Sequence, residues 1–202
     1  MASNYSNLDN YLKSHVAGKG SSFTHTRIGD KSLKIYGGSY SIRDNNQFID
    51  MYFDKVFVKH EKEYLTEKQL IEDGPILIDI DLRYDQSVTE RQHSGDHVLD
   101  CVMLYADKIG EMLDISDGAE IDVYVMEKGN VNRTDTKTKD GIHIIFGIKM
   151  HKALQVILRD RVMPELKESW DDLPVTNTWE EVIDDGIAKG FVNWQLYGSR
   201  KP

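Results

Sequence analysis

The stretch PILIDIDL, residues 75–82, decides the fold prediction for this chain. It is a short apolar run that two acids interrupt, and it follows an Asp-Gly-Pro turn that begins at Asp73, which is typical of a β-strand. Side chains alternate between the two faces of a strand, so Asp79 and Asp81 are expected on one face. The isoleucines and the leucine between and beside them are then expected to face the core.

Working outward from this strand, apolar residues at helical or alternating spacing predict the elements that follow. Pro164 is expected to kink the last long helix or to end its first half. The predicted elements are a helix over 97–113, a strand over 120–128, a polar loop over 129–141, a strand over 142–148, a helix over about 150–169, a short helix over 178–189 and a strand over 191–198.

The resulting order is β-α-β-β-α-β, the split arrangement of ferredoxin-like and RNA-recognition-motif domains. In such a sheet the first and third strands lie side by side at the centre. We therefore expect an α+β fold with an RRM-like module over residues 71–202. Residues 1–70 are expected to form a smaller α/β module packed beside it, with two strands within 32–43 and a helix over 44–60.

The composition of the 202 residues restricts the class of protein. No apolar run approaches the roughly 20 residues of a membrane-spanning helix, and the N-terminus lacks the apolar core of a signal peptide. The single cysteine, Cys101, rules out an internal disulfide and a multi-cysteine zinc site. A soluble, intracellular protein with no structural metal is expected.

Charge is distributed unevenly along the chain. A net charge of −9 is unexpected for a protein that binds nucleic acid, because neutralising phosphates requires Lys and Arg. Residues 1–60 nevertheless hold eight Lys and Arg against five Asp, whereas the remaining residues hold 17 basic against 29 acidic residues. Charge alone argues mildly against strong, non-specific DNA binding.

Carboxylates and a histidine are the candidate catalytic groups. Carboxylates as close as Asp79 and Asp81 repel unless a positive charge lies between them, and hard oxygen ligands favour Mg²⁺ or Mn²⁺. His143, in the strand predicted beside them, could donate to a phosphate oxygen. A third carboxylate before the last strand is either Asp184 or Asp185. The alternatives are an acidic strand face, a half-buried histidine and a capping acid.

Several cations could meet a triphosphate or a template strand. Arg200 and Lys201 follow a Gly-Ser turn near the C-terminus, and Lys137 and Lys139 precede His143 in the predicted loop. A solvated terminus or a solvated loop is the alternative for each of these pairs.

Together these pieces resemble the archaeo-eukaryotic primase superfamily, which has three motifs in this chain order. ILIDID at 76–81 is similar to the first motif, a strand that ends in Asp-x-Asp or Asp-x-Glu. GIH at 141–143 resembles the second, with glycine in place of the commoner serine before the histidine. Ile183-Asp184 resembles the third, in which an apolar residue precedes an acid. The resemblance covers roughly residues 30–202.

The segment after the third motif distinguishes between the two acids. Primase–polymerases carry an Asn-aromatic-x-Leu-Tyr-x-Ser-x-Lys run there, and NWQLYGSRK at 193–201 lies at the same offset from Asp184. The resemblance thus implies Asp184 rather than Asp185, although Gln195 stands where those enzymes carry an arginine. The nucleotide-binding residues that the resemblance implies are His143, Lys139, Ser199, Arg200, Lys201 and Arg43.

The resemblance implies two-metal nucleotidyl transfer that joins NTPs or dNTPs on a DNA template during replication. It implies Asp79, Asp81 and Asp184 as ligands of Mg²⁺ or Mn²⁺. The wording is most similar to primase–helicases of large nucleocytoplasmic DNA viruses. An N-terminal domain with a helicase C-terminal to it is therefore expected, in the host cytoplasm or at a viral replication site.

Three alternatives to a primase are compatible with parts of this pattern. A glycosyltransferase also uses Asp-x-Asp, but it needs a longer nucleotide-binding region before the motif. An RNA-recognition-motif-like module reads bases with aromatics on the central strands, where this chain has Asp79, Asp81 and His143. A degenerate primase domain, acting as a non-catalytic binding module of a replication helicase, fits the same motifs.

Overall fold

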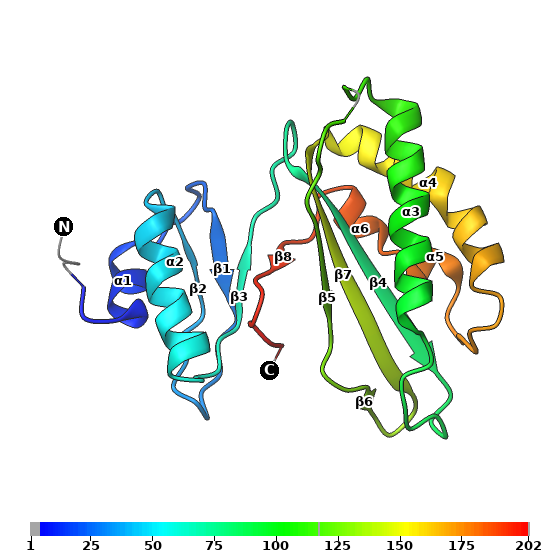
Figure 1. Cartoon of the computed structure of the whole chain (residues 1–202). Helices are drawn as coiled ribbons and strands as arrows, with labels where there is room; N and C mark the ends of the chain where they lie inside the picture. The colour runs from blue at the N-terminus through cyan, green and yellow to red at the C-terminus, as the bar shows by residue number, and fades with distance from the viewer. Residues whose placement is uncertain (1–4, 117, 202) are drawn as a thin grey trace. The chain divides into compact units, whose positions relative to one another are not determined.

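The computed structural model describes residues 5–116 and 118–201, which form two units (Figure 1). The first unit combines Met1–Gln69 with Val192–Pro202, and the second is Leu70–Phe191. The last eleven residues, predicted to lie in the second module, thus cluster with the first. Both units combine helices with antiparallel strands, so the α+β prediction is confirmed.

An antiparallel sheet of strand order β4-β7-β5 forms the framework of the second unit, with α3 and α4 on one face (Figure 1). The first and third predicted strands, expected to be neighbours, are β4 and β7, and they pair along ten residue pairs. The elements of this sheet and its helices are β4 (Pro75–Tyr84), α3 (Gly95–Met112), β5 (Val123–Glu127), β6 (Asn132–Arg133, which pairs with β7), β7 (Thr138–Lys149) and α4 (Lys152–Ser169).

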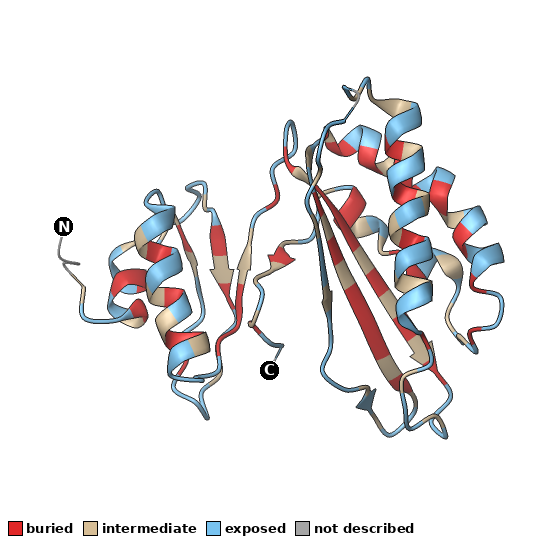
Figure 2. Cartoon of the chain, in the orientation of Figure 1, coloured by how far each residue is buried: buried red, intermediate tan, exposed pale blue. Residues whose placement is uncertain are grey.

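Alternation along β4 and β7 creates the core of this unit. Figure 2 shows buried and half-buried residues following one another along both strands. The buried side chains pack against the inner sides of α3 and α4, so the residues between them belong to the opposite face of the sheet. The core side chains of these strands include Ile76, Ile78, Ile80, Leu82, Ile142, Ile144 and Phe146.

The two long helices begin and end for local reasons. At the start of α3 the Ser94 side chain accepts from the His97 amide, and the His97 ring accepts from the Ser94 amide. The helix α4 does not end at Pro164. Pro164 and Asp160 are both exposed, so water can solvate the Asp160 carbonyl that proline leaves without a helical donor. No helix among the described residues has the length and apolar character to cross a bilayer.

The last strand differs from the prediction for 191–198. Only Trp194–Gln195 is a strand, β8, and it pairs with β3 (Leu65–Glu67) in the sheet of the first unit. The Ser199 hydroxyl accepts from the Leu65 amide at 3.0 Å and holds the C-terminal segment on this strand. The sheet of the second unit therefore has three of the four predicted strands, and the four-stranded RRM-like arrangement is not confirmed.

An irregular segment, and not a fourth strand, lies along the edge of β4. An isolated antiparallel bridge joins Ile80 to Ile183, and the amide of Thr176 donates to the Arg83 carbonyl at 2.7 Å. This bridge interrupts the helix predicted over 178–189, which the structure divides into α5 (Trp179–Val182) and α6 (Asp185–Ala188).

The first unit is built around a buried ion-pair network. Arg27 donates to Glu63 at 2.7 and 2.6 Å and pairs with Asp9 at 2.8 Å, while Lys55 contacts the same two acids. Removing Glu63, the fully buried acid, would break its pairs with both cations, and breaking a buried ion pair typically costs about 3–5 kcal/mol. The elements here are α1 (Leu8–Ser14), β1 (His25–Arg27), β2 (Gly38–Tyr40), α2 (Asn45–Phe53), a π-helical turn (Asp54–Val58), β3 and β8, with the strand order β2-β1-β3-β8.

The sequence predictions for the first unit are met in part. Of the two strands expected within 32–43, only β2 forms. The helix expected over 44–60 is α2 with its π-helical extension. Asp44 caps its N-terminus, and the Asp44 side chain accepts from the Gln47 amide.

Lys152, in the first turn of α4, predicts a pH dependence of folding. The side chain is buried and donates to Gln155 Oε1 at 2.8 Å and to the Ile187 carbonyl at 3.4 Å. Burial lowers the pKa of its ammonium group to about 8, from 10.5. The folded chain therefore binds fewer protons than the unfolded chain between these pH values, and the free energy of unfolding rises with pH across this window.

We expect Lys152→Met to remove this rise of the unfolding free energy with pH, because methionine carries no titratable group. Urea denaturation of both proteins at pH 7 and pH 10 measures the effect. An equal change of unfolding free energy with pH in the two proteins would contradict it.

Candidate active site

The register between β4 and β7 sets the predicted catalytic residues opposite one another. Asp79 is paired with His143, and Asp81 is paired with Gly141. Directly paired residues of antiparallel strands point to the same side, so these four positions share the sheet face opposite α3 and α4. We call this the carboxylate face. His143 Nε2 lies 3.3 Å from Asp79 Oδ1.

Asp184 adjoins Asp79 on the other side of β4. Its amide donates to the Asp79 carbonyl at 3.0 Å. The bridge between Ile80 and Ile183, continued by one residue, sets Asp184 opposite Asp79. Both isoleucines are buried, so by alternation Asp184 belongs to the carboxylate face. The Asp184 carboxylate accepts from the Gly186 amide at 2.7 Å. The backbone thus brings three acids to adjoining positions.

Asp185, the other acid that spacing left open, is engaged differently. It is exposed and forms an ion pair with Lys189, one helical turn further on. The hydrogen bond from that ammonium group lowers the pKa of Asp185. Of the two acids, Asp184 is therefore the one that lies next to Asp79.

Asn177 holds the edge of β4 beside Asp81, and sequence reasoning missed it. Its Nδ2 donates to the Asp81 carbonyl at 2.9 Å, and its Oδ1 accepts from the Arg83 amide at 3.1 Å. One side-chain amide thus replaces a neighbouring strand for two backbone groups. A lone asparagine in a polar loop carries no pattern that could have identified this role.

The predicted phosphate-binding cations are divided between the two units. Lys139 lies in β7 opposite Arg83, on the carboxylate face. Arg43, Arg200 and Lys201 are exposed residues of the first unit. Their role at the carboxylate face stays a prediction.

Ser199, also predicted to bind nucleotide, is a buried residue of the first unit. Besides accepting from the Leu65 amide, its hydroxyl lies 2.9 Å from the Tyr52 hydroxyl. These contacts give the Ser199 hydroxyl a structural role in holding the C-terminal segment, and we leave it out of the proposed site.

The two units carry opposite net charges. The first unit holds twelve Lys and Arg against eight acids, whereas the second holds 13 against 26. The carboxylate face therefore belongs to a strongly acidic unit. Any phosphate group that approaches it needs nearby cations to offset this charge.

The carboxylate face suits a hard divalent cation in its chemistry, because three adjoining residues offer only carboxylate oxygens. In the described part of the chain, however, no three acidic, histidine or cysteine side chains converge at metal-binding distance. The Asp184 carboxylate is directed at the Gly186 amide and that of Asp79 at His143. Bound Mg²⁺ or Mn²⁺ would require these side chains to turn toward one another.

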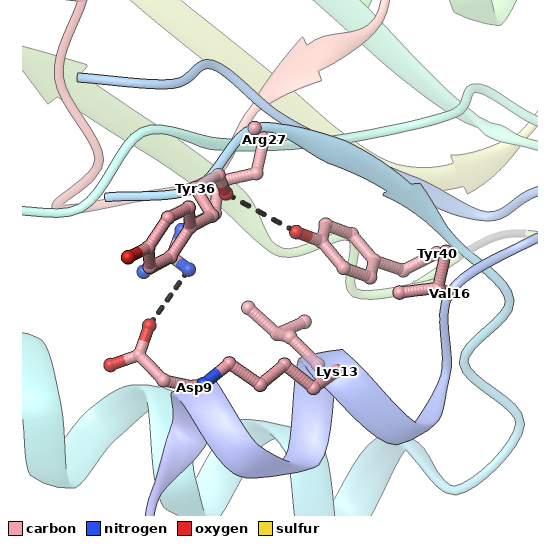
Figure 3. Close-up of a pocket in the computed structure, with 8 residues that line it drawn as sticks. Asp9, Lys13, Val16, Arg27, Tyr36 and Tyr40 are labelled. Carbon is pink, nitrogen blue, oxygen red and sulfur yellow. Dashed lines mark hydrogen bonds and ion pairs between the residues drawn. The ribbon is translucent and has the colours of Figure 1, made fainter. Parts of the chain in front are cut away.

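A cavity of about 250 Å³ in the first unit differs in character from the carboxylate face. Figure 3 shows Arg27 directed at Asp9 and the Tyr40 hydroxyl directed at the Tyr36 carbonyl. Because Arg27 also pairs with Glu63, its charge is neutralised within the protein. The cavity offers no uncompensated arginine to an anion.

The contacts of Asn177 generate a prediction about stability. Asn177→Ala leaves the Asp81 carbonyl and the Arg83 amide without this partner, so we expect a loss of about 1–3 kcal/mol of unfolding free energy. Chemical denaturation measures it. Asn132→Ala, a change at an exposed strand residue, is the control and should stay within about 0.5 kcal/mol of wild type. Equal effects of the two changes would contradict the role of Asn177.

Comparison with known proteins bears on this geometry. Residues 29–202 match the family model described as the C962R protein N-terminal AEP domain, where AEP denotes archaeo-eukaryotic primase. The chain is also 30% identical over 169 residues to a protein of Acanthamoeba polyphaga mimivirus that is named as a candidate helicase, L207/L206. That match covers 81% of this chain but only 17% of the mimivirus protein. The resemblance predicted from the motifs is confirmed, and the chain belongs to the archaeo-eukaryotic primase family.

Proposed function

We propose that this chain is a primase–polymerase domain that joins NTPs or dNTPs on a DNA template. Membership of the family supports a primase-type domain. One observation carries the catalytic part of the proposal, namely that Asp79, Asp81 and Asp184 occupy adjoining backbone positions beside His143. Acids in this number on one sheet face suit a site that uses divalent cations, as this family generally does.

The proposed mechanism assigns a role to each of these residues. A bound pair of Mg²⁺ or Mn²⁺ ions supplies activation of the attacking 3′-hydroxyl and neutralisation of the leaving pyrophosphate. Asp79, Asp81 and Asp184 would hold the ions through their carboxylates. His143, 3.3 Å from Asp79, would donate a hydrogen bond to a phosphate oxygen and orient the triphosphate. Lys139, on the same face, would balance part of the phosphate charge.

We further propose that the chain works beside a helicase domain in a longer protein. The mimivirus relative is named as a candidate helicase, and the chain corresponds to 17% of its length. DNA unwinding by such a domain would supply the single-stranded template.

A non-catalytic binding module of a replication helicase is the second candidate function. One observation favours it: among the described residues, no three acidic, histidine or cysteine side chains converge at metal-binding distance. In that case the excess of basic residues in the first unit would bind DNA, and the acids of the carboxylate face would have no catalytic part. The two candidates differ in what the loss of these acids does.

Replacing Asp79 and Asp81 together by alanine tests the catalytic proposal. We expect the double variant to make no detectable product on unprimed single-stranded DNA with labelled NTPs or dNTPs and Mg²⁺ or Mn²⁺. Circular dichroism and thermal unfolding should show an intact fold, because both side chains lie on the face opposite the core. Synthesis retained by the double variant would exclude Asp79 and Asp81 as the catalytic acids, whereas the absence of synthesis by wild type would favour the binding module.

Asp184→Asn and Asp185→Asn form a matched pair of adjacent single-atom changes. We expect Asp184→Asn to lower the rate of synthesis by about a hundredfold or more, the scale on which active sites respond to the loss of one electrostatic group. Asp185→Asn removes only an exposed ion pair with Lys189 and should leave the rate within about twofold. Primer-extension rates measure both. The reverse order of effects would exclude Asp184 as the third carboxylate.

A further inference from the structure

The position of Gly141 on the carboxylate face is closed to a side chain. A Cβ atom placed on Gly141 would lie 2.9 Å from the Ile80 carbonyl oxygen, which is closer than such atoms approach. Serine at this position, the commoner residue in the second motif, would therefore require a shift of the β4–β7 pair. In this backbone arrangement the position accommodates glycine and not serine.

The ammonium group of Lys128 reaches this position instead. Its Nζ lies 3.3 Å and its Cε 3.6 Å from the place that a Cβ on Gly141 would take. Lys128 directly follows β5, in which Met126 is paired with His143 and Glu127 with Ile142. The next step of this register sets Lys128 beside Gly141 with its side chain on the carboxylate face.

Hydrogen bonds from Arg91 connect the backbone of Lys128 to the buried Asp140. Arg91 donates through Nη2 to the Lys128 carbonyl, and through Nε to Oδ2 of the buried Asp140 at 2.9 Å. The Asp140 carboxylate in turn accepts from the Gly141 amide at 2.9 Å. Arg91 also pairs with Glu127 at 3.0 Å. This network fixes the residues on both sides of the contact while the lysine side chain stays exposed.

The charge of Lys128 is available for a ligand. In the part of the chain that the structure describes, the Lys128 ammonium group forms no ion pair, whereas Arg83, also on this face, is paired with Glu181. The Gly141 position, which the Lys128 ammonium group reaches, is paired with Asp81 and lies between Lys139 and His143 along β7. Same-face positions on a strand are about 6.6–6.8 Å apart, so neighbouring groups of this row can contact successive phosphates.

We propose that Lys128 is a phosphate-binding residue of this site, in the place that a serine takes in the commoner form of the motif. The proposal rests on the proposed function, because it assumes that a phosphate approaches the carboxylate face. The phosphate belongs either to the incoming nucleoside triphosphate or to the DNA backbone. An ammonium group contacts both by the same charge-assisted hydrogen bond.

The experiment compares Lys128→Ala and Lys128→Arg with wild type in the 202-residue chain. Lys149→Ala is the matched control, because Lys149 is an exposed lysine at the far end of β7. Fluorescence anisotropy measures the dissociation constants of a labelled non-hydrolysable deoxynucleoside triphosphate with Mg²⁺ and of a labelled primer–template DNA. Steady-state synthesis gives KM for the nucleotide and kcat.

We expect Lys128→Ala to raise the dissociation constant of one probe by about ten- to a hundredfold, the effect of losing one hydrogen bond to a charged group. Lys128→Arg should restore most of this affinity, and Lys149→Ala should change neither probe. A loss confined to the triphosphate, with a matching rise in KM, assigns the lysine to the incoming nucleotide. A loss confined to DNA assigns it to a backbone phosphate.

Unchanged affinity of Lys128→Ala for both probes would overturn the inference, as would the absence of binding of either probe to wild type. These outcomes are separate from failure of the proposed function. That failure shows as no synthesis by wild type, or as synthesis that survives loss of Asp79 and Asp81, whatever the binding measurements give.

Discussion

The register between β4 and β7 is the constraint on which the candidate site depends. A slip of one residue would turn Asp79 and Asp81 toward the helices and Ile80 away from them. The isoleucines of both strands are buried against α3 and α4, and this burial opposes such a slip. Each isoleucine that the slip exposed to water would cost about 1.5–3 kcal/mol of hydrophobic stabilisation. Packing on one face of the sheet thus positions the carboxylates on the other.

The edge of β4 shows how the third acid is placed without a regular strand. An open strand edge leaves backbone amides and carbonyls without partners. Here the amide of Asp184 and the side chain of Asn177 satisfy the carbonyls of Asp79 and Asp81, and the bridge at Ile183 anchors the segment in the core. The segment that covers this edge is therefore also the segment that carries the third carboxylate.

The net charge of −9 comes from the second unit alone, because the first unit is basic. Twice as many acids as bases lie in the second unit, whereas the first unit has an excess of bases. An acidic unit repels phosphates at long range, so binding there depends on a few cations in defined positions. Lys139 and Lys128 lie on the carboxylate face, and the geometry of Gly141 leaves room for the second of them.

The sequence by itself determined the strand at 75–82, the shared face of Asp79 and Asp81, and a neighbouring strand with His143. These features follow from a period of two residues along one segment, which is a local property of the chain. The family was also recognisable from short motifs in their order.

The tertiary structure decided which segments pair. The sequence pattern over 191–198 does not indicate which strand this segment pairs with. In the structure β8 pairs with β3, and the Ser199 hydroxyl accepts a hydrogen bond from the Leu65 amide. Spacing left Asp184 and Asp185 equivalent, and a hydrogen bond to Asp79, 105 positions earlier in the chain, separates them. The contact of Lys128 with the Gly141 position and the bonds of Asn177 likewise join residues far apart in sequence, so no local pattern could reveal them.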